Sequence, residues 1–150
     1  MRILVDHISK FTRDVYPLLV EFGRAAGLPE PFASEDEFCS IWDGIVDADA
    51  GVTILALDNG RIAGCLGALF SPRVYWSGGM ATETFFWVRP RYRGGLTAAR
   101  LLRQFEVEAK GRGCAVACVG HKSQFRAEEM ERFYKRFGYS PLEVMYQKEL

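Results

Sequence analysis

The chain has 150 residues, 49% of them apolar, which is enough for one domain with its own core. Its 19 basic and 19 acidic residues cancel, so the long-range field that would gather nucleic acid or anionic lipid is missing. Composition therefore favours a single domain over residues 1–150 and excludes a strongly charged binding protein.

The amino terminus, MRILVDHISKFTRD, builds no apolar run of the signal-peptide kind, and no stretch approaches the roughly 18 apolar residues of a membrane span. The four cysteines contain no Cys-x-x-Cys pair, and only two histidines could complete a metal site. We expect a soluble cytoplasmic protein with reduced thiols, no metal and no membrane partner.

The first third of the chain alternates strand and helix patterns. An apolar run at residues 2–6 predicts a strand, and helical apolar spacing from Thr12 to Ala26 predicts a helix that Gly27 ends. Ser34 and Glu37 form the S-x-x-E capping box of a second helix. The apolar stripe predicted for that helix consists of Phe38, Ile41, Trp42 and Ile45.

Strand patterns dominate the middle of the chain. Asn59 and Gly60 separate two apolar runs, VTILALD and RIAGCLGALF, and supply the positive φ angles of a tight hairpin, so these runs are predicted to be antiparallel neighbours. ATETFFWV, at residues 81–88, is rich in β-branched and aromatic residues and reads as a central strand.

The last third returns to alternation. We predict a helix from about Gly95 to Lys110, a strand at CAVACVG, a helix from about Phe125 to Phe137 and a final strand at LEVMYQKEL. The resulting order is β, α, α, β, β, β, α, β, α, β, with short connections and no linker or repeat. This order is typical of an α/β domain.

The segment VRPRYRGGLTAARLL, at residues 88–102, leads from a strand through two glycines into a helix. Glycines at such a turn leave backbone N–H groups exposed, and the helix dipole adds positive potential, which favours an anion such as pyrophosphate. The alternative is that Gly94 and Gly95 only tighten the turn. Neither a Walker motif nor a G-x-G-x-x-G fingerprint is present.

These residues resemble the first signature of the GNAT family of N-acetyltransferases: a strand ending in Val, then Pro-x-Tyr-Arg-Gly, an Arg/Gln-x-x-Gly-x-Gly/Ala loop and a helix with Leu-Leu. The matching positions are Val88, Pro90, Tyr92, Arg93, Gly94, Ala98, Leu101 and Leu102. MERFYKRFGYSP resembles the family's second signature. The resemblance implies a mixed, mostly antiparallel sheet flanked by helices, and the Arg-Gly-Gly variant is most similar to a branch frequent in bacteria and their phages.

The resemblance also implies that acetyl-CoA is the acetyl donor. The backbone of Phe86, Trp87 and Val88 is expected to pair with the pantetheine arm, as a peptide pairs with a strand edge. The residues expected to cradle the pyrophosphate, mainly through their backbone, are Arg93, Gly94, Gly95, Leu96, Thr97 and Ala98. Leu96 departs from the pattern because it replaces the first motif glycine, which puts coenzyme affinity in question.

Two residues are expected to carry the chemistry by resemblance. Tyr134 aligns with a tyrosine that protonates or hydrogen-bonds the departing thiolate, although it also lies on an apolar helical stripe and could be core. Glu83 is the carboxylate of the central strand and the candidate base, with His121 or water as alternatives. Strand alternation places Glu83 on the opposite face from Val88 unless a bulge resets the parity.

The expected activity is transfer of acetyl to a primary amine by direct attack in a ternary complex. The cysteines lie in apolar contexts without a paired histidine, which disfavours a covalent intermediate. The alternatives are an inactive acyl-CoA-binding sensor or assembly subunit and, more remotely, a nucleic-acid adaptor. Small-molecule and protein amines both remain open as acceptors, four aromatic residues are candidates for lining the acceptor pocket, and dimers are common among relatives. Those aromatic candidates are Phe38, Trp42, Tyr75 and Trp76.

Overall fold

A computed structural model describes residues 1–30 and 32–150. The chain divides into two compact units, Met1–Cys118 and Val119–Leu150, each described by itself below. Within the described residues, no helix is long and apolar enough to cross a membrane.

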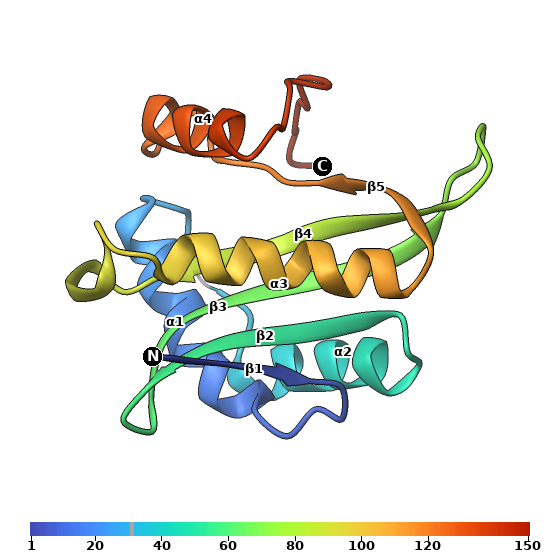
Figure 1. Cartoon of the computed structure of the whole chain (residues 1–150). Coiled ribbons are helices and arrows are strands. Elements are labelled where there is room, and N and C mark those ends of the chain that lie inside the picture. The colour runs from blue at the N-terminus through green and yellow to red at the C-terminus, as the bar shows by residue number, and fades with distance from the viewer. Residues whose placement is uncertain (31) are drawn as a thin grey trace. The chain divides into compact units, whose positions relative to one another are not determined.

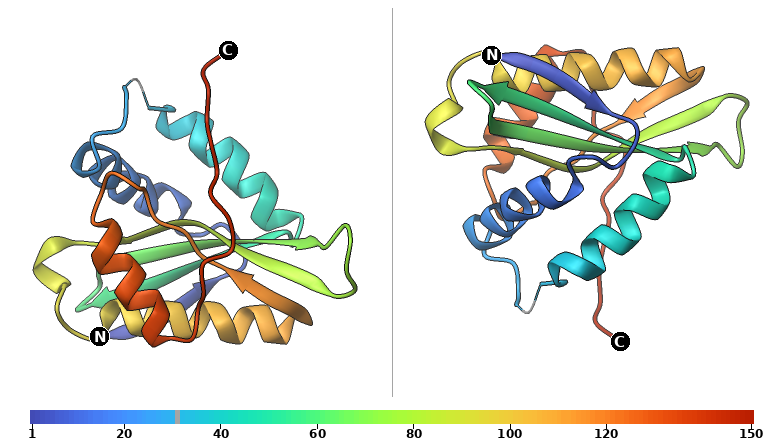
Figure 2. Two further views of the ribbon diagram at one scale, coloured as in Figure 1. Left: turned by 90° about the horizontal axis from the view of Figure 1, so that it is seen from above. Right: turned by 90° about the horizontal axis from the view of Figure 1, so that it is seen from below.

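The first unit holds one five-stranded sheet in the order β1-β2-β3-β4-β5. The first three pairings are antiparallel and the last, between β4 and β5, is parallel. Helices α1 and α2 cover one face of the sheet and α3 covers the other (Figures 1 and 2). The prediction of an α/β fold with a mixed, mostly antiparallel sheet is confirmed. Its elements are β1 Arg2–Asp6, α1 Thr12–Ala25, α2 Glu35–Asp47, β2 Gly51–Asp58, β3 Arg61–Pro72, β4 Gly79–Val88, the 3-10 turn η1 Pro90–Tyr92, α3 Thr97–Gly111 and β5 Cys114–Cys118.

Local sequence signals account for several of these elements. The Ser34 hydroxyl accepts the N–H of Glu37 at 3.2 Å and the Glu37 carboxylate accepts the N–H of Ser34 at 2.7 Å, so the predicted capping box is present. Asn59 and Gly60 have φ angles of 48° and 79°, as the predicted hairpin turn between β2 and β3 requires.

The buried face of α2 differs from the predicted stripe. Cys39, Trp42 and Val46 are buried, whereas Ile41 is 64% exposed. At 100° per residue, Ile41 lies well over 90° from the centre of that buried face, so the predicted stripe was right for Trp42 and wrong for Ile41.

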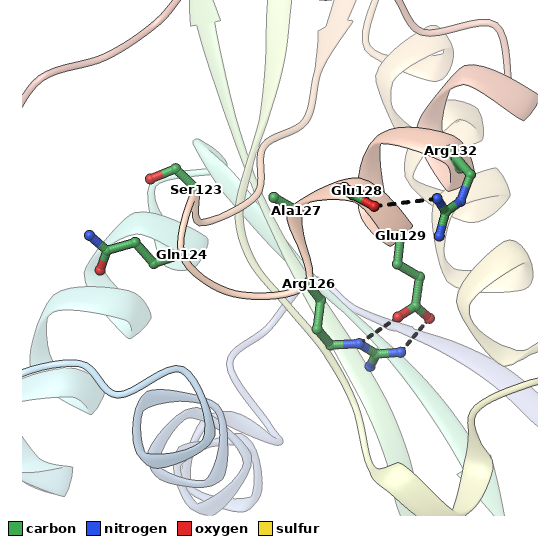
Figure 3. Close-up of a pocket in the computed structure, with 7 residues that line it drawn as sticks. All are labelled: Ser123, Gln124, Arg126, Ala127, Glu128, Glu129 and Arg132. Atoms are coloured by element: carbon green, nitrogen blue, oxygen red, sulfur yellow. Dashed lines mark hydrogen bonds and ion pairs between the residues drawn. The ribbon is translucent and has the colours of Figure 1, made fainter.

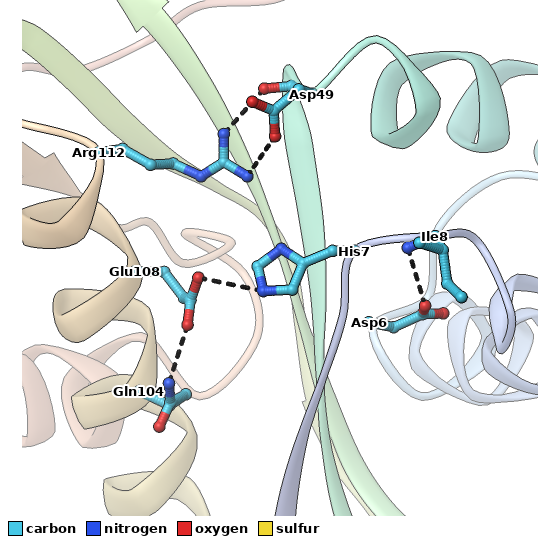
Figure 4. Close-up of polar contacts among 7 residues, drawn as sticks. All are labelled: Asp6, His7, Ile8, Asp49, Gln104, Glu108 and Arg112. Carbon is cyan, nitrogen blue, oxygen red and sulfur yellow. Dashed lines mark hydrogen bonds and ion pairs between the residues drawn. The ribbon is translucent and has the colours of Figure 1, made fainter.

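Helix α3 is fixed to the sheet by both an apolar and a polar side. The apolar side of α3 is its buried face, formed by Leu101, Leu102, Phe105 and Ala109. On its flank, Glu108 lies 3.6 Å from His7 Nε2 and accepts a hydrogen bond from Gln104, while Arg112 donates to the Asp49 carboxylate and carbonyl (Figure 4). These contacts tie the C-terminal half of α3 to the residues that follow β1 and precede β2.

The second unit contains one helix, α4, at Ala127–Arg136. The predicted helix is therefore confirmed, but the predicted strand at LEVMYQKEL is wrong, because residues 139–150 form no strand and residues 140–150 are exposed. Alternating side chains make a strand only where a neighbouring strand accepts the backbone hydrogen bonds, and sequence alone does not supply that neighbour.

Candidate functional site

Strand β4 carries a bulge next to Glu83. Ala68 is in register with Glu83, and the next residue of β3, Gly67, is in register with Phe85, so Thr84 is the extra residue of β4. Val88 is in register with Gly64, four residues from Ala68. Cross-strand partners share a face, so Glu83 and Val88 belong to the same face of the sheet. The alternation that would have separated them is broken.

The two neighbours of β4 accompany it over different lengths. The parallel pairing with β5 runs to Thr82, opposite Cys118, whereas the antiparallel pairing with β3 runs on to Val88. Because the N–H of Arg89 bonds Ala63 of β3 at 2.9 Å, alternation turns the main-chain groups of Val88 away from β3. The Val88 carbonyl accepts the Nε of Arg93 at 2.8 Å, so on this side of β4 the groups open to an amide-bearing arm are the N–H of Val88 and, by the same alternation, the main-chain groups of Phe86, whereas those of Trp87 turn toward β3.

The turn after β4 needs a glycine at one position. Gly94 has a φ of 79°, in the left-handed region, and a Cβ at Gly94 or Gly95 would meet no atom within 4 Å. The backbone of both glycines therefore borders open space. A Cβ at Gly95 would project into that space, so an approaching ligand would meet it there.

The N-terminus of α3 follows this turn directly. Its N-cap residue is Leu96, which has no side-chain oxygen to cap the helix, and α3 begins at Thr97. The N–H groups of the first turn, Thr97 to Ala99, thus point out of the helix end without a capping side chain. Together with the open glycine backbone, they form an array of main-chain donors of the kind that binds a phosphate or diphosphate. Thr97 is buried, Ala98 half-buried and Leu96 66% exposed.

A charged cluster that sequence reasoning missed lies beside the end of β4. The Glu21 carboxylate of α1 accepts hydrogen bonds from Arg89 at 2.8 and 3.1 Å and from the Trp87 indole at 3.3 Å. Chiefly because of the Arg89 hydrogen bonds, the pKa of Glu21 is lowered, and the Glu21 hydrogen bond raises the pKa of Arg89. Arg89 also donates to the Ile62 carbonyl at 2.9 Å, so the cluster joins α1, β3 and β4.

Arg93 folds back onto the strand that precedes it. Its Nε donates to the Val88 carbonyl at 2.8 Å, and its guanidinium lies 4.3 Å from the centroid of the Trp87 ring. Trp87 itself is buried and packs on Phe22 of α1, with ring centroids 5.6 Å apart. The Arg93 side chain therefore links the start of the glycine turn to the end of β4 and stabilises the conformation of that turn.

Tyr134 and His121 belong to the second unit. The Tyr134 hydroxyl donates to the Gly120 carbonyl at 2.9 Å, and its ring lies 5.6 Å from Phe133 and 5.9 Å from Tyr139. Tyr134 is buried, so a packing role and a role as acid both remain consistent with its surroundings. His121 is exposed, with Nδ1 3.4 Å from the Lys122 carbonyl.

The start of α4 forms a shallow hollow that holds none of the expected site residues (Figure 3). Arg126, which has a φ of 52°, makes a two-pronged ion pair with Glu129, and Glu128 lies 3.7 Å from Arg132. Pairs of opposite charge thus occupy its walls, and we assign it no role.

Three of the cysteines are poor nucleophiles. Cys65 is fully buried, and burial raises the pKa of its thiol to about 12. Burial also raises the pKa of Cys39 and of Cys114. Because the thiolate is the reactive form, these environments argue against a covalent acyl-enzyme at these positions.

Among the residues that the structure describes, no three His, Cys, Asp or Glu side chains group into a metal site.

The aromatic residues proposed for the acceptor pocket separate into three environments. Trp42 is core, because its buried indole donates to Thr53 at 2.8 Å. Tyr75 and Trp76 are exposed at the tip between β3 and β4, 5.9 Å apart by ring centroids. Phe38 is half-buried.

Comparisons with known proteins identify solved structures with the same fold. The chain has the fold of a ribosomal-protein-alanine N-acetyltransferase from Brucella melitensis, at 15% identity, TM-score 0.76 and coverage of 100% of both chains. It has the fold of an aminoglycoside acetyltransferase from an uncultured soil sample, at 12% identity, TM-score 0.82 and coverage of 99% of this chain and 95% of that one. The glucosamine-6-phosphate N-acetyltransferase of Arabidopsis thaliana gives 16% identity, TM-score 0.74 and 99% coverage of both.

No curated protein matches the chain. These identities show a shared fold and leave the acceptor unassigned. The sequence pattern of the acetyltransferase (GNAT) family, however, matches residues 12–139, a stretch that contains the bulged strand, the glycine turn and α4. With this match over most of its length, the chain belongs to the GNAT family of acetyltransferases.

Proposed function

We propose that this acetyltransferase uses acetyl-CoA as donor and acetylates a primary amine by direct attack within a ternary complex. The observation that carries the proposal is the junction of β4 and α3, where the open backbone of Gly94 and Gly95 leads directly into helix N–H groups that no side chain caps. Such an array of fixed donors suits a diphosphate and needs no side-chain charge.

Each candidate residue has a defined task in this proposal. Bound acetyl-CoA would supply a thioester, whose C–S bond breaks as the amine nitrogen bonds to the acetyl carbon. Glu83 accepts the proton that the amine loses, directly or through water, and its position beyond the bulge places it on the face of Val88. Tyr134 donates a proton or a hydrogen bond to the thiolate. His121 or water is the alternative base.

Alignment of the two substrates is expected to supply most of the rate. Holding amine and thioester together can contribute about 7 kcal/mol or more to lowering the barrier. Residues 86–88 serve this purpose if their backbone holds the pantetheine arm in extended form alongside β4. The role of the protein's ionisable groups is then limited to two proton transfers.

The test is release of the CoA thiol, followed with a chromogenic thiol reagent while acetyl-CoA is presented with polyamines, aminoglycosides, amino acids and short peptides. Glu83→Gln and Tyr134→Phe are expected to lower turnover on the preferred amine by at least 10²-fold, as loss of general acid or base catalysis does. Glu143→Gln and Tyr146→Phe are matched controls, since both residues are exposed in irregular chain. Initial-rate lines that intersect support a ternary complex, whereas parallel lines would contradict it.

A coenzyme-binding sensor or assembly subunit is the second candidate, and Leu96 is the observation that favours it. Leu96 stands where the family pattern has a glycine, so the loop need not have kept full catalytic competence. Calorimetry that shows CoA binding, combined with no thiol release on any amine, would support the sensor. Absence of binding to CoA and acetyl-CoA would contradict both candidates.

The proposed partners are an amine acceptor, either a small molecule or a protein, and a second copy of the chain. Sedimentation at micromolar concentration tests the homodimer. No nucleic-acid or membrane partner is proposed, and DNA or RNA binding that fell steeply with salt would overturn that part of the proposal.

A further inference from the structure

The side chain of Arg93 closes a short loop of chain on itself. Its Nε bonds the carbonyl of Val88, five residues earlier, and the bond therefore spans the whole of η1. A charged donor on a carbonyl acceptor makes one of the stronger hydrogen bonds of proteins. Gly94, whose left-handed conformation redirects the chain toward α3, follows immediately.

The surface against which Arg93 rests is held from a distant part of the sequence. The Trp87 ring lies under the guanidinium, and its indole N–H bonds Glu21 of α1. The same carboxylate binds Arg89, so Glu21 fixes the residues on both sides of Val88. A continuous set of contacts thus leads from α1 through Trp87 to Arg93.

We propose that Arg93 is a positioning residue for the coenzyme turn, with Glu21 as its support, and that its charge is not what binds the diphosphate. The proposal rests on the proposed function, in which this turn receives CoA. A side chain bonded to Val88 and stacked on Trp87 presets the main-chain conformation of the turn, so that its N–H groups need not be ordered when the ligand arrives.

This role depends on the shape of the guanidinium. Lysine keeps the positive charge but has no Nε donor beside a planar group, so it cannot both bond Val88 and stack on Trp87. A residue that served as a point charge for a phosphate would tolerate the change to lysine. Arg93→Lys therefore separates the two roles. Arg91→Lys is the matched control, because Arg91 is exposed and its guanidinium stacks on a neighbouring ring, Tyr92, at 4.7 Å.

The experiment is calorimetric titration of CoA into the full chain and its variants at one salt concentration. Arg93→Lys and Arg93→Ala are both expected to weaken the affinity for CoA about tenfold or more, the factor that corresponds to one charge-assisted hydrogen bond. Glu21→Gln is expected to weaken it several-fold, and the double variant Glu21→Gln, Arg93→Lys to lose less than the product of the single losses. Arg91→Lys should bind as the unmodified protein does.

Wild-type affinity in Arg93→Lys, with loss only in Arg93→Ala, would overturn the proposal in favour of a direct charge contact. Independent, multiplicative losses in the double variant would also overturn the link to Glu21.

Amide hydrogen exchange gives a second measurement that needs no coenzyme. Faster exchange at residues 94–98 in Arg93→Lys and Glu21→Gln, but not in Arg91→Lys, is expected, and unchanged exchange would contradict the positioning role. If the unmodified protein bound no CoA while these rates still changed, the proposed function would fail and the positioning role would stand.

Discussion

The two adjacent glycines of the β4–α3 turn allow a sharp test of how the turn is built. Gly94 has a φ of 79°, whereas the φ of Gly95 is outside the left-handed region. A Cβ added to either residue would meet no atom within 4 Å. Replacing each glycine by alanine therefore changes backbone energetics without a steric clash, and the two variants differ only in the conformation they must adopt.

The expected effects have opposite signs. For Gly94→Ala, an L residue forced into the left-handed region costs roughly 1–2 kcal/mol. For Gly95→Ala, the side chain restricts the unfolded chain more than the folded one, and the expected gain is about 0.4–1 kcal/mol. The two variants should therefore differ by about 1.5–3 kcal/mol in the free energy of unfolding.

Urea denaturation followed by circular dichroism measures this difference, and an unchanged slope of unfolding free energy against urea shows that the comparison is valid. Equal shifts of the same sign in both variants would refute the argument that Gly94 alone carries the strained conformation. Titration with CoA then adds a second readout. If the open side of Gly95 faces the ligand, Gly95→Ala should weaken binding in a protein that is no less stable.

Three further predictions concern the core, the thiols and the response to acid. Trp42→Phe should destabilise the protein by about 2 kcal/mol in urea denaturation, because it leaves the buried Thr53 hydroxyl without its indole donor; Trp76→Phe, at an exposed tip, should change stability by less than about 0.5 kcal/mol. Iodoacetamide at pH 8 should leave Cys65 unmodified in the folded protein and modify it in urea, as peptide mass mapping can check, because burial raises the pKa of its thiol to about 12. The Arg89 hydrogen bond lowers the pKa of Glu21. The ionised Glu21 carboxylate therefore stabilises the fold above the ordinary pKa of 4.5, and this stabilisation is lost as the pH falls through the lowered pKa. The difference in unfolding free energy between the unmodified protein and Glu21→Gln should accordingly shrink below about pH 4.5.

What could be predicted from the sequence was local. The capping box of Ser34 and Glu37 and the hairpin at Asn59 and Gly60 depend on residues within a few positions of each other, and both are present as predicted. The failure at residues 142–150 has the same origin, because the alternating pattern states which side chains would share a face but not whether a partner strand exists.

The parts of the site that residue patterns alone could not establish depend on distant residues. Glu21 and Arg89 are 68 positions apart, and nothing in the helical spacing of α1 marks Glu21 as different from any other polar residue on that helix. The bulge at Thr84 is likewise set by how β4 meets β3, and resemblance to a family was needed to anticipate it. Tyr134 and Glu83 were named by resemblance, and their roles stay predictions until turnover is measured.

Leu96 occupies a motif position that usually holds glycine, and its conformation explains how the turn accommodates the change. Its φ is −90° and its ψ is 1°, which any L residue can adopt, so the left-handed step of this turn lies two residues earlier, at Gly94. Leu96→Gly should therefore change the free energy of unfolding by less than about 0.5 kcal/mol in urea denaturation, because the freedom that glycine adds to the unfolded chain is offset by the preference for glycine over leucine at a helix N-cap.

The affinity for CoA should change less than about threefold in the same variant, because the main-chain donors stay where Gly94 and α3 put them and the leucine side chain is 66% exposed. Calorimetry with CoA distinguishes this account from its opposite. If Leu96→Gly bound CoA tenfold more tightly, or about 1.4 kcal/mol better by the standard conversion, the leucine side chain would be an obstruction in the cradle. Full affinity for CoA would then require a glycine at position 96, and the explanation centred on Gly94 would be wrong.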